Sequence, residues 1–149
     1  NKSIKTAFIF NVKKGDTIQV KVSLSPVSVK GAALNMKEEL PEWNFQKTRL
    51  AARQAWDKEL GRIEVVDERE DLKKTFYTAL YHCMIHPSIA MDVDSMYRGM
   101  DDQEHKATDH AHYSVFSLWD TFRALHPLLT IIDQKRTSDF IKTFLSMYT

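Results

Sequence analysis

The chain contains little cysteine and no excess of either charge. One cysteine, Cys83, among 149 residues cannot form an internal disulfide. Twenty-one basic and twenty acidic side chains leave a net charge of +1, which gives no electrostatic basis for binding nucleic acid or an anionic membrane surface. No apolar run approaches the ~20 residues that a membrane-spanning helix needs, so we expect no membrane span. The 43% hydrophobic and 11% aromatic shares are typical of a globular protein.

The ends of the sequence also lack familiar features. It begins with Asn1 rather than methionine, and its first residues do not show the pattern of a signal peptide. It stops at Thr149 while a helical pattern continues. We therefore expect the chain to be a fragment, whose partners include the remainder of the same polypeptide.

Two histidine pairs fall short of a recognisable metal site. His82 and His86 lie four residues apart, but Cys83 follows the first, where a zinc protease motif has its glutamate. His110 and His112 would lie on one face of a strand, yet no third ligand is evident. Neither pair is predicted to bind a metal.

The aspartates that follow Pro87 invite a calcium interpretation, which a known loop motif can test. An EF-hand loop begun at Asp92 would need glycine at its sixth position and glutamate at its twelfth. The chain has Tyr97 and Gln103 at these positions, so the motif is excluded. We interpret the aspartates as loop residues that cap backbone N–H groups.

Hydrophobic periodicity predicts a β part followed by a helical part. Residues 8–12 are compatible with a strand of period two, and residues 18–24 alternate in polarity after turn residues 13–16. This pattern predicts a β-hairpin belonging to a larger sheet. The later pattern predicts helices over about 31–40, 44–60, 68–86, 115–129 and from 137 onward, a short strand at 63–66, and a second hairpin over 96–107. We expect the fourth helix to bend or break at Pro127. Residues 137–139 are expected to cap the last helix.

Residues 115–123, V-F-S-L-W-D-T-F-R, combine an indole, a carboxylate and a guanidinium within an apolar segment. Helical spacing would place Asp120 and Arg123 on one face. One interpretation is a structural ion pair between these two residues, beside a core Trp119. The other is a pocket floor for a sugar, because an indole packs against sugar C–H groups and a carboxylate accepts hydrogen bonds from hydroxyls. Spacing alone favours the first interpretation.

Three motifs give the sequence a family resemblance. They are T-F-Y-T-A-L-Y-H at residues 75–82, D-V-D at 92–94 followed by Y-R-G-M-D at 97–101, and V-F-S-L-W-D-T-F-R-A-L-H-P at 115–127. Together they resemble the start of the catalytic domain of glycoside hydrolase family 92, the calcium-dependent exo-acting α-mannosidases. Residues 24–60 resemble the family's inter-domain region more loosely. Family sequences usually have glycine where this chain has Ser95, so the shape of that turn does not follow from the resemblance.

The resemblance implies a mixed fold, with β structure first and helices after it. Residues 1–28 would end an N-terminal β-sandwich domain, and residues 29–67 would form inter-domain linker helices. Residues 68–149 would supply the first helices of an (α/α)6 toroid, the catalytic domain.

The resemblance also implies an activity and a site. Enzymes of this family remove terminal mannose from glycans with inversion, which we expect here at α-1,2 linkages, with calcium as cofactor. Trp119 and Asp120 would bind the terminal mannose, Arg123 would orient Asp120, and Tyr97 and Asp101 would lie close to the substrate. With the resemblance included, the sugar-binding interpretation of Trp119 is preferred.

The catalytic residues and most metal ligands are expected outside this chain. The family's catalytic acid, its base and most of its calcium ligands would lie outside this chain, so the chain alone is expected to be inactive. The enzyme would be periplasmic or extracellular. Two alternatives remain: a non-catalytic carbohydrate-binding protein, and a helical scaffold in which the aromatic stretch is only core.

Overall fold

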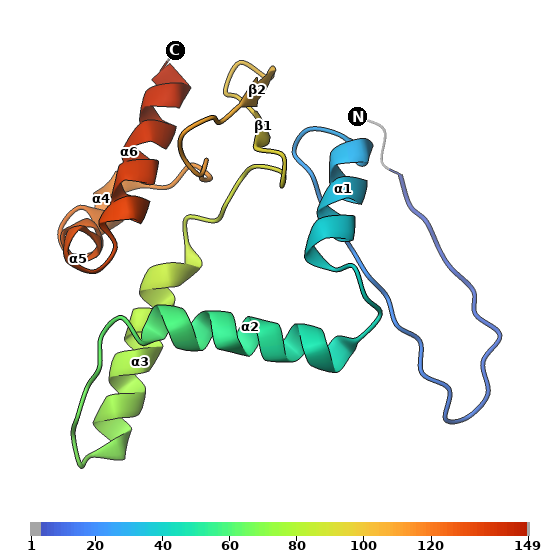
Figure 1. The fold of residues 1–149 in the computed structure, drawn as a ribbon, viewed down its shortest axis with the longest axis horizontal. Coiled ribbons are helices and arrows are strands. Elements are labelled where there is room, and N and C mark those ends of the chain that lie inside the picture. Colours follow the sequence, from blue (N-terminus) through green and yellow to red (C-terminus); the bar gives the residue numbers. More distant parts are fainter. Residues whose placement is uncertain (1–3, 149) are drawn as a thin grey trace.

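The computed structural model describes residues 4–148, and Figure 1 shows the path of the chain. In this part, a long N-terminal segment without regular secondary structure leads to helices and one two-stranded hairpin, which confirms a mixed fold. In order, the elements are α1 (Val29–Glu39), α2 (Phe45–Leu60), α3 (Glu70–Ile85), β1 (Met96–Arg98), β2 (Glu104–Lys106), α4 (Leu118–Thr121), α5 (Leu125–Ile132) and α6 (Gln134–Tyr148). None of these helices is both long enough and apolar enough to cross a lipid bilayer.

The starts of α1 and α2 follow from capping side chains. Ser28 Oγ accepts a hydrogen bond from the backbone N–H of Gly31 at 3.0 Å, and Asn44 Oδ1 accepts one from Lys47 N–H at 3.0 Å. Such caps satisfy backbone donors that have no partner inside the helix. The predicted helix from about Asn44 to Leu60 is therefore confirmed.

The buried core lies near the C-terminal end, where α5 packs against α6. Four of its side chains are buried: Tyr113, Phe116, Leu129 and Phe140. Tyr113 and Phe140 meet edge to face, with ring centroids 4.7 Å apart. Because Phe116 lies two residues before α4, this core anchors the chain just ahead of that short helix.

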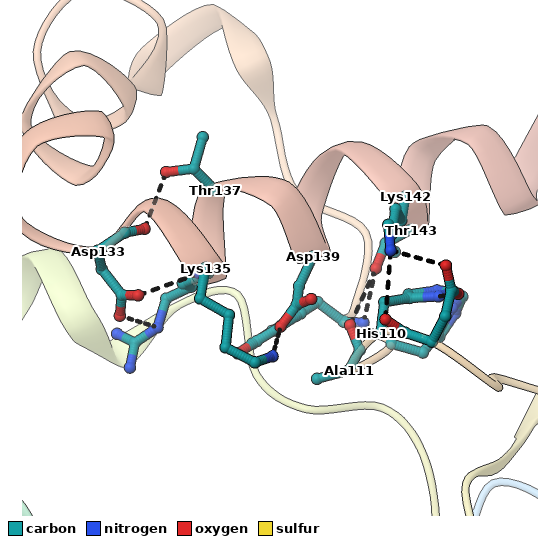
Figure 2. Close-up of polar contacts among 12 residues, drawn as sticks. His110, Ala111, Asp133, Lys135, Thr137, Asp139, Lys142 and Thr143 are labelled. Atoms are coloured by element: carbon teal, nitrogen blue, oxygen red, sulfur yellow. Dashed lines mark hydrogen bonds and ion pairs between the residues drawn. The ribbon is translucent and has the colours of Figure 1, made fainter.

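Polar side chains of α6 hold the segment that leads into this core (Figure 2). Thr143 Oγ1 accepts a hydrogen bond from Tyr113 N–H at 3.2 Å and donates one to the Ala111 carbonyl at 3.4 Å. Lys142 Nζ donates to Asp109 Oδ2 at 2.7 Å. This bond, and a second from His110, lower the pKa of Asp109 to about 2. The segment is thus fixed at several points along one helix.

The second predicted hairpin is confirmed. β1 and β2 pair antiparallel, with Tyr97 opposite His105. In the turn before β1, Ser95 N–H donates to the Asp92 carbonyl at 2.9 Å, and Ser95 has φ of 69°. This left-handed conformation is one that glycine adopts at no steric cost. Ser95 therefore occupies the backbone geometry of the glycine that the family resemblance associates with this position.

Replacing Ser95 by glycine is expected to raise the free energy of unfolding by about 0.5–1 kcal/mol. Removing Cβ relieves the left-handed backbone, and this gain exceeds the extra entropy that glycine gives the unfolded chain. Urea denaturation measures the change. Ser95→Ala is the matched control, since it removes the hydroxyl but keeps Cβ, and it should give no gain. Equal stabilisation by both variants would contradict the argument.

The prediction of an N-terminal β-hairpin is wrong, because its two strands do not form. The turn is present, with Gly15 at φ of 101° and Asp16 N–H donating to the Lys13 carbonyl at 3.1 Å. Residues 8–12 and 18–24, however, form no strands. Their apolar side chains are open to solvent, with Phe8 77% and Val20 72% exposed. An isolated hairpin is marginal in water without a packed face, and no other described part of the chain covers this one.

One predicted strand is absent, and the last helix begins earlier than expected. Residues 63–66 form no strand, because no neighbouring strand pairs with them among the described residues. The last helix begins at Gln134, before the expected caps at 137–139. Asp133 Oδ1 accepts the hydrogen bond from Arg136 N–H at 3.0 Å, so an earlier aspartate provides the cap.

The predicted break in the helix over 115–129 is present, but its predicted position at His126-Pro127 is wrong. The helix is divided into α4 and α5, and the break falls at residues 122–124 rather than at Pro127. Ala124 has φ of −133° and ψ of −48°, outside helical geometry. Pro127 is the third residue of α5, where its missing N–H has no helical acceptor in any case.

Candidate functional site

The central residues of the predicted site, Trp119 and Asp120, lie on the single turn of α4 (Figure 1). Ser117 precedes this turn and its Oγ accepts a hydrogen bond from Trp119 N–H at 3.3 Å. The Trp119 side chain is 86% exposed. Asp120 is exposed too, and within residues 4–148 no hydrogen bond or ion pair engages its carboxylate. The turn thus presents an indole and an adjoining carboxylate to solvent.

The structural interpretation of this stretch does not hold in the described chain. Trp119 is not a core residue. Asp120 and Arg123 form no ion pair, and Arg123 makes no hydrogen bond to any residue in the range 4–148. The reason is the chain break: three-residue spacing brings side chains together only in a continuous helix, and α4 ends at Thr121. The expected orientation of Asp120 by Arg123 is therefore not seen.

Tyr97 and Asp101 lie on the hairpin, a separate part of the fold. Tyr97 is 6% exposed, and its ring stacks on His112 with centroids 3.7 Å apart and on His105 at 5.6 Å. Burial, followed by the charges of His110 and His105, lowers the pKa of His112 to about 4. The imidazole that faces Tyr97 is thus neutral near pH 7, and the stack is an uncharged aromatic contact.

Asp101 is an exposed carboxylate in the hairpin turn. It accepts hydrogen bonds from Gln103 N–H at 3.0 Å and from His105 Nε2 at 3.0 Å. The Gln103 N–H, then His105, lower the pKa of Asp101 below its ordinary value. Its oxygens are therefore partly engaged in holding the turn.

A small pocket connects the hairpin with the segment that leads to α4. Its volume is about 150 Å³, and its walls include Tyr97, His112, Ser114 and Val115. Trp119 and Asp120 do not line it. The five predicted site residues therefore form two groups, Trp119, Asp120 and Arg123 on one side and Tyr97 and Asp101 on the other.

A buried cluster around Asp92 was not predicted. Asp92 is 2% exposed, and its Oδ1 accepts a hydrogen bond from Asn35 Nδ2 at 2.7 Å while its Oδ2 accepts one from Ser25 Oγ at 2.6 Å. Asn35 Oδ1 in turn accepts from Val93 N–H at 2.9 Å. The aspartate was expected to cap backbone N–H groups, whereas its partners are side chains far away in the sequence. No local sequence signal could have identified them.

The described residues form no cluster of carboxylate side chains that could hold a calcium ion. Within residues 4–148, no three His, Cys, Asp or Glu side chains come together as a metal site requires. Asp92, in the loop before β1, has both oxygens engaged by Ser25 and Asn35. Calcium prefers six to eight oxygen ligands, and these neighbours supply no such set.

Comparison with known proteins places the chain in a family. The sequence profile of the glycosyl hydrolase family 92 catalytic domain matches residues 31–149. A family GH92 α-mannosidase from Bacteroides thetaiotaomicron is similar in structure, with a TM-score of 0.76 and 42% identity over 83% of this chain and 16% of that one. The structure of that enzyme in complex with mannoimidazole gives a TM-score of 0.77.

Two further relatives support the same family. A family GH92 inverting mannosidase from Bacteroides thetaiotaomicron has a TM-score of 0.74 and 29% identity over 80% of this chain and 16% of its own. An uncharacterised secreted glycosidase from Arthroderma benhamiae is 32% identical over 74 residues, which are 47% of this chain and 10% of that protein. The chain thus spans 10–16% of the length of these relatives. Because the family profile extends over most of the chain and the structures agree, the chain belongs to the catalytic domain of glycosyl hydrolase family 92.

Proposed function

We propose that the chain is part of an exo-acting α-mannosidase and supplies residues that bind the terminal mannose. The observation that carries this proposal is the turn of α4, where an 86% exposed indole stands beside a carboxylate with no partner in residues 4–148. An exposed aromatic face beside a free carboxylate suits a hexose, which has apolar faces and a rim of hydroxyls. Family membership and the mannoimidazole complex of a relative support mannose as that hexose.

Each residue has a proposed role. Trp119 packs against the C–H face of the sugar, and Asp120 accepts hydrogen bonds from its hydroxyls. Arg123, exposed and free of ion pairs within the described residues, lies close enough in sequence to turn toward Asp120 when sugar is bound. Tyr97 and Asp101 border the site from the hairpin.

The reaction proposed is hydrolysis of an α-1,2-linked terminal mannose with inversion. Inversion uses a carboxylic acid and a carboxylate base about 6.5–9.5 Å apart, with a water between them. We assign neither group to this chain, so its contribution is binding and orientation of the sugar, and the chain alone is proposed to be inactive. A relative named as an inverting mannosidase supports this stereochemistry.

The proposal also includes calcium, the domain architecture and the location of the enzyme. Calcium would help to orient sugar hydroxyls, with ligands outside residues 4–148. Residues 68–149 would contribute the first helices of an (α/α)6 toroid, and residues 1–28 the end of a β-sandwich. A relative described as secreted supports export to the periplasm or the medium.

The test is Asp120→Ala in the full-length enzyme that carries this chain. Loss of charge-assisted hydrogen bonds to the sugar is expected to lower kcat/KM for an α-1,2-mannobioside about 50-fold, while Tm changes little because Asp120 has no partner in the described structure. Trp119→Ala should act in the same direction. Asp71→Ala, which removes an exposed carboxylate from α3, is the matched control and should leave kcat/KM unchanged.

Other outcomes would favour the alternatives. An enzyme that binds mannosides through Trp119 but never turns them over would be a carbohydrate-binding protein. Unchanged kinetics in both variants, combined with a large fall in Tm, would instead favour a helical scaffold.

A further inference from the structure

The turn that carries Trp119 and Asp120 has little support of its own. Helix α4 contains only four residues, and a backbone hydrogen bond from Phe122 N–H to the Leu118 carbonyl at 3.1 Å closes its end. A single helical turn is not stable by itself in water, because nucleation fixes several residues for one hydrogen bond. The side chains of Trp119 and Asp120 are exposed and form no hydrogen bond or ion pair within residues 4–148. Something else must therefore fix the orientation of the turn.

Thr121, at the end of the same turn, connects it to a half-buried neighbour, His126. Its Oγ1 donates to the Ser117 carbonyl at 2.9 Å and lies 2.9 Å from His126 Nε2. A threonine hydroxyl has one hydrogen, and the bond to Ser117 uses it, so the contact with His126 requires the imidazole to donate from Nε2. One hydroxyl thus joins the start of the turn to the imidazole.

His126 is itself held by the aromatic core. Its ring lies 5.2 Å from that of Phe116 and 6.1 Å, edge to face, from that of Phe140, measured between centroids. Both phenylalanines are buried, at 8% and 3% exposed. Burial lowers the pKa of His126, which favours the neutral ring in this aromatic setting. The imidazole therefore offers one fixed donor at the edge of a packed core.

We propose that His126 is a positioning residue: through its hydrogen bond to Thr121 it fixes the turn 117–121, so that Trp119 and Asp120 meet a hexose in one preformed geometry. This inference rests on the proposed function for the sugar itself, but the order of the turn can be measured without any sugar. Preformed geometry matters for affinity because ordering a mobile loop on binding costs free energy.

The test uses Thr121→Val, which keeps the β-branched shape and removes the hydroxyl, with Thr121→Ser as the matched control that retains it. In the full-length enzyme that carries this chain, every tryptophan other than Trp119, including Trp43 and Trp56, is replaced by phenylalanine, so that Trp119 is the only indole. Time-resolved fluorescence anisotropy, well below Tm, then reports the local motion of Trp119. We expect Thr121→Val to increase the amplitude of the fast motion of Trp119 and to raise the Kd for methyl α-mannoside about tenfold. Thr121→Ser should leave both quantities as they are in the parent protein.

A second variant, His126→Phe, tests whether the effect comes from the hydrogen bond rather than from the substitution at Thr121. It retains an aromatic ring between Phe116 and Phe140 and removes the donor, and it should reproduce the behaviour of Thr121→Val. Unchanged motion of Trp119 in both variants would overturn the positioning role, whatever happens to Tm. If the parent protein does not bind methyl α-mannoside, the proposed function fails, while the anisotropy still decides whether His126 orders the turn.

Discussion

Replacing Gly31 by alanine is expected to lower the free energy of unfolding by about 3 kcal/mol, although alanine is the better helix former. Gly31 lies in the first turn of α1 and is buried. A Cβ at this position would lie 2.2 Å from Asp92 Oδ2 and 2.7 Å from Ser25 Oγ. Both contacts are far inside van der Waals distance, so the neighbours would have to move.

The carboxylate cannot move cheaply. Asp92 is 2% exposed, and its position is set by the hydrogen bonds from Ser25 and Asn35. Rotating it away from an added Cβ would break or lengthen both. Hydrogen bonds to a charged group contribute about 1.5–3 kcal/mol each, whereas the helix propensity gained by replacing glycine with alanine is about 1 kcal/mol. The steric and polar loss therefore exceeds the gain.

Urea denaturation of Gly31→Ala in two backgrounds provides the measurement. In the parent protein the substitution should destabilise. In an Asp92→Ser background, where the crowding carboxylate is gone and only Ser25 Oγ remains close, the same substitution should destabilise clearly less. Destabilisation of equal size in both backgrounds would contradict the proposed contact and would indicate a cause elsewhere in α1.

The part of the fold that could be predicted from sequence is the part decided by neighbours in the chain. Asn44 caps α2 through Lys47, three residues away, and the hairpin of β1 and β2 follows from its own turn residues. Strand formation at residues 8–12 and 18–24 depends instead on a packed face, and alternation in polarity cannot supply one. Asp92 likewise depends on Ser25 and Asn35, which lie 67 and 57 residues away.

The candidate site divides in the same way. The sequence identified the residue types at Trp119 and Asp120, and their chemistry needs no tertiary information. The expected pairing of Asp120 with Arg123 assumed a continuous helix, and apolar spacing cannot reveal that the chain leaves helical geometry at Ala124. The Thr121–His126 contact was not foreseen either, because it crosses that same break.

A second large effect is expected at a network of four charged side chains that joins α2 to α6. Glu59 Oε2 lies 2.9 Å from Arg62 Nε and 2.9 Å from Arg136 Nη2. Asp133 Oδ2 lies 3.2 Å from Arg62 Nη2 and 3.2 Å from Arg136 Nε. Each carboxylate contacts both guanidinium groups, so the four charges form a closed ring.

The ring is partly buried, which makes its loss costly. The Asp133 side chain is 9% exposed, and those of Arg136 and Glu59 are 21% and 26% exposed. Isolated exposed ion pairs contribute little, but removing one partner from a buried pair leaves an uncompensated charge and costs about 3–5 kcal/mol. Asp133→Ala also removes the cap at the start of α6 (Figure 2). We expect it to lower the free energy of unfolding by about 3 kcal/mol.

The pH dependence of stability offers an independent measure of the ring. The hydrogen bond from Arg62, with the nearby charge of Arg136, lowers the pKa of Glu59 below its ordinary value of 4.5. A carboxylate whose folded pKa lies below its unfolded pKa stabilises the fold above the unfolded value, and this contribution is lost as pH falls through the folded pKa. The parent protein should therefore lose more stability between pH 5 and the acid range than Glu59→Gln does. The urea midpoints of both proteins are measured in parallel over this range. Their difference removes the contribution of the other carboxylates, which titrate in both proteins. Identical pH profiles would show that Glu59 is not held by the two arginines in solution, because only a perturbed Glu59 makes the profiles diverge.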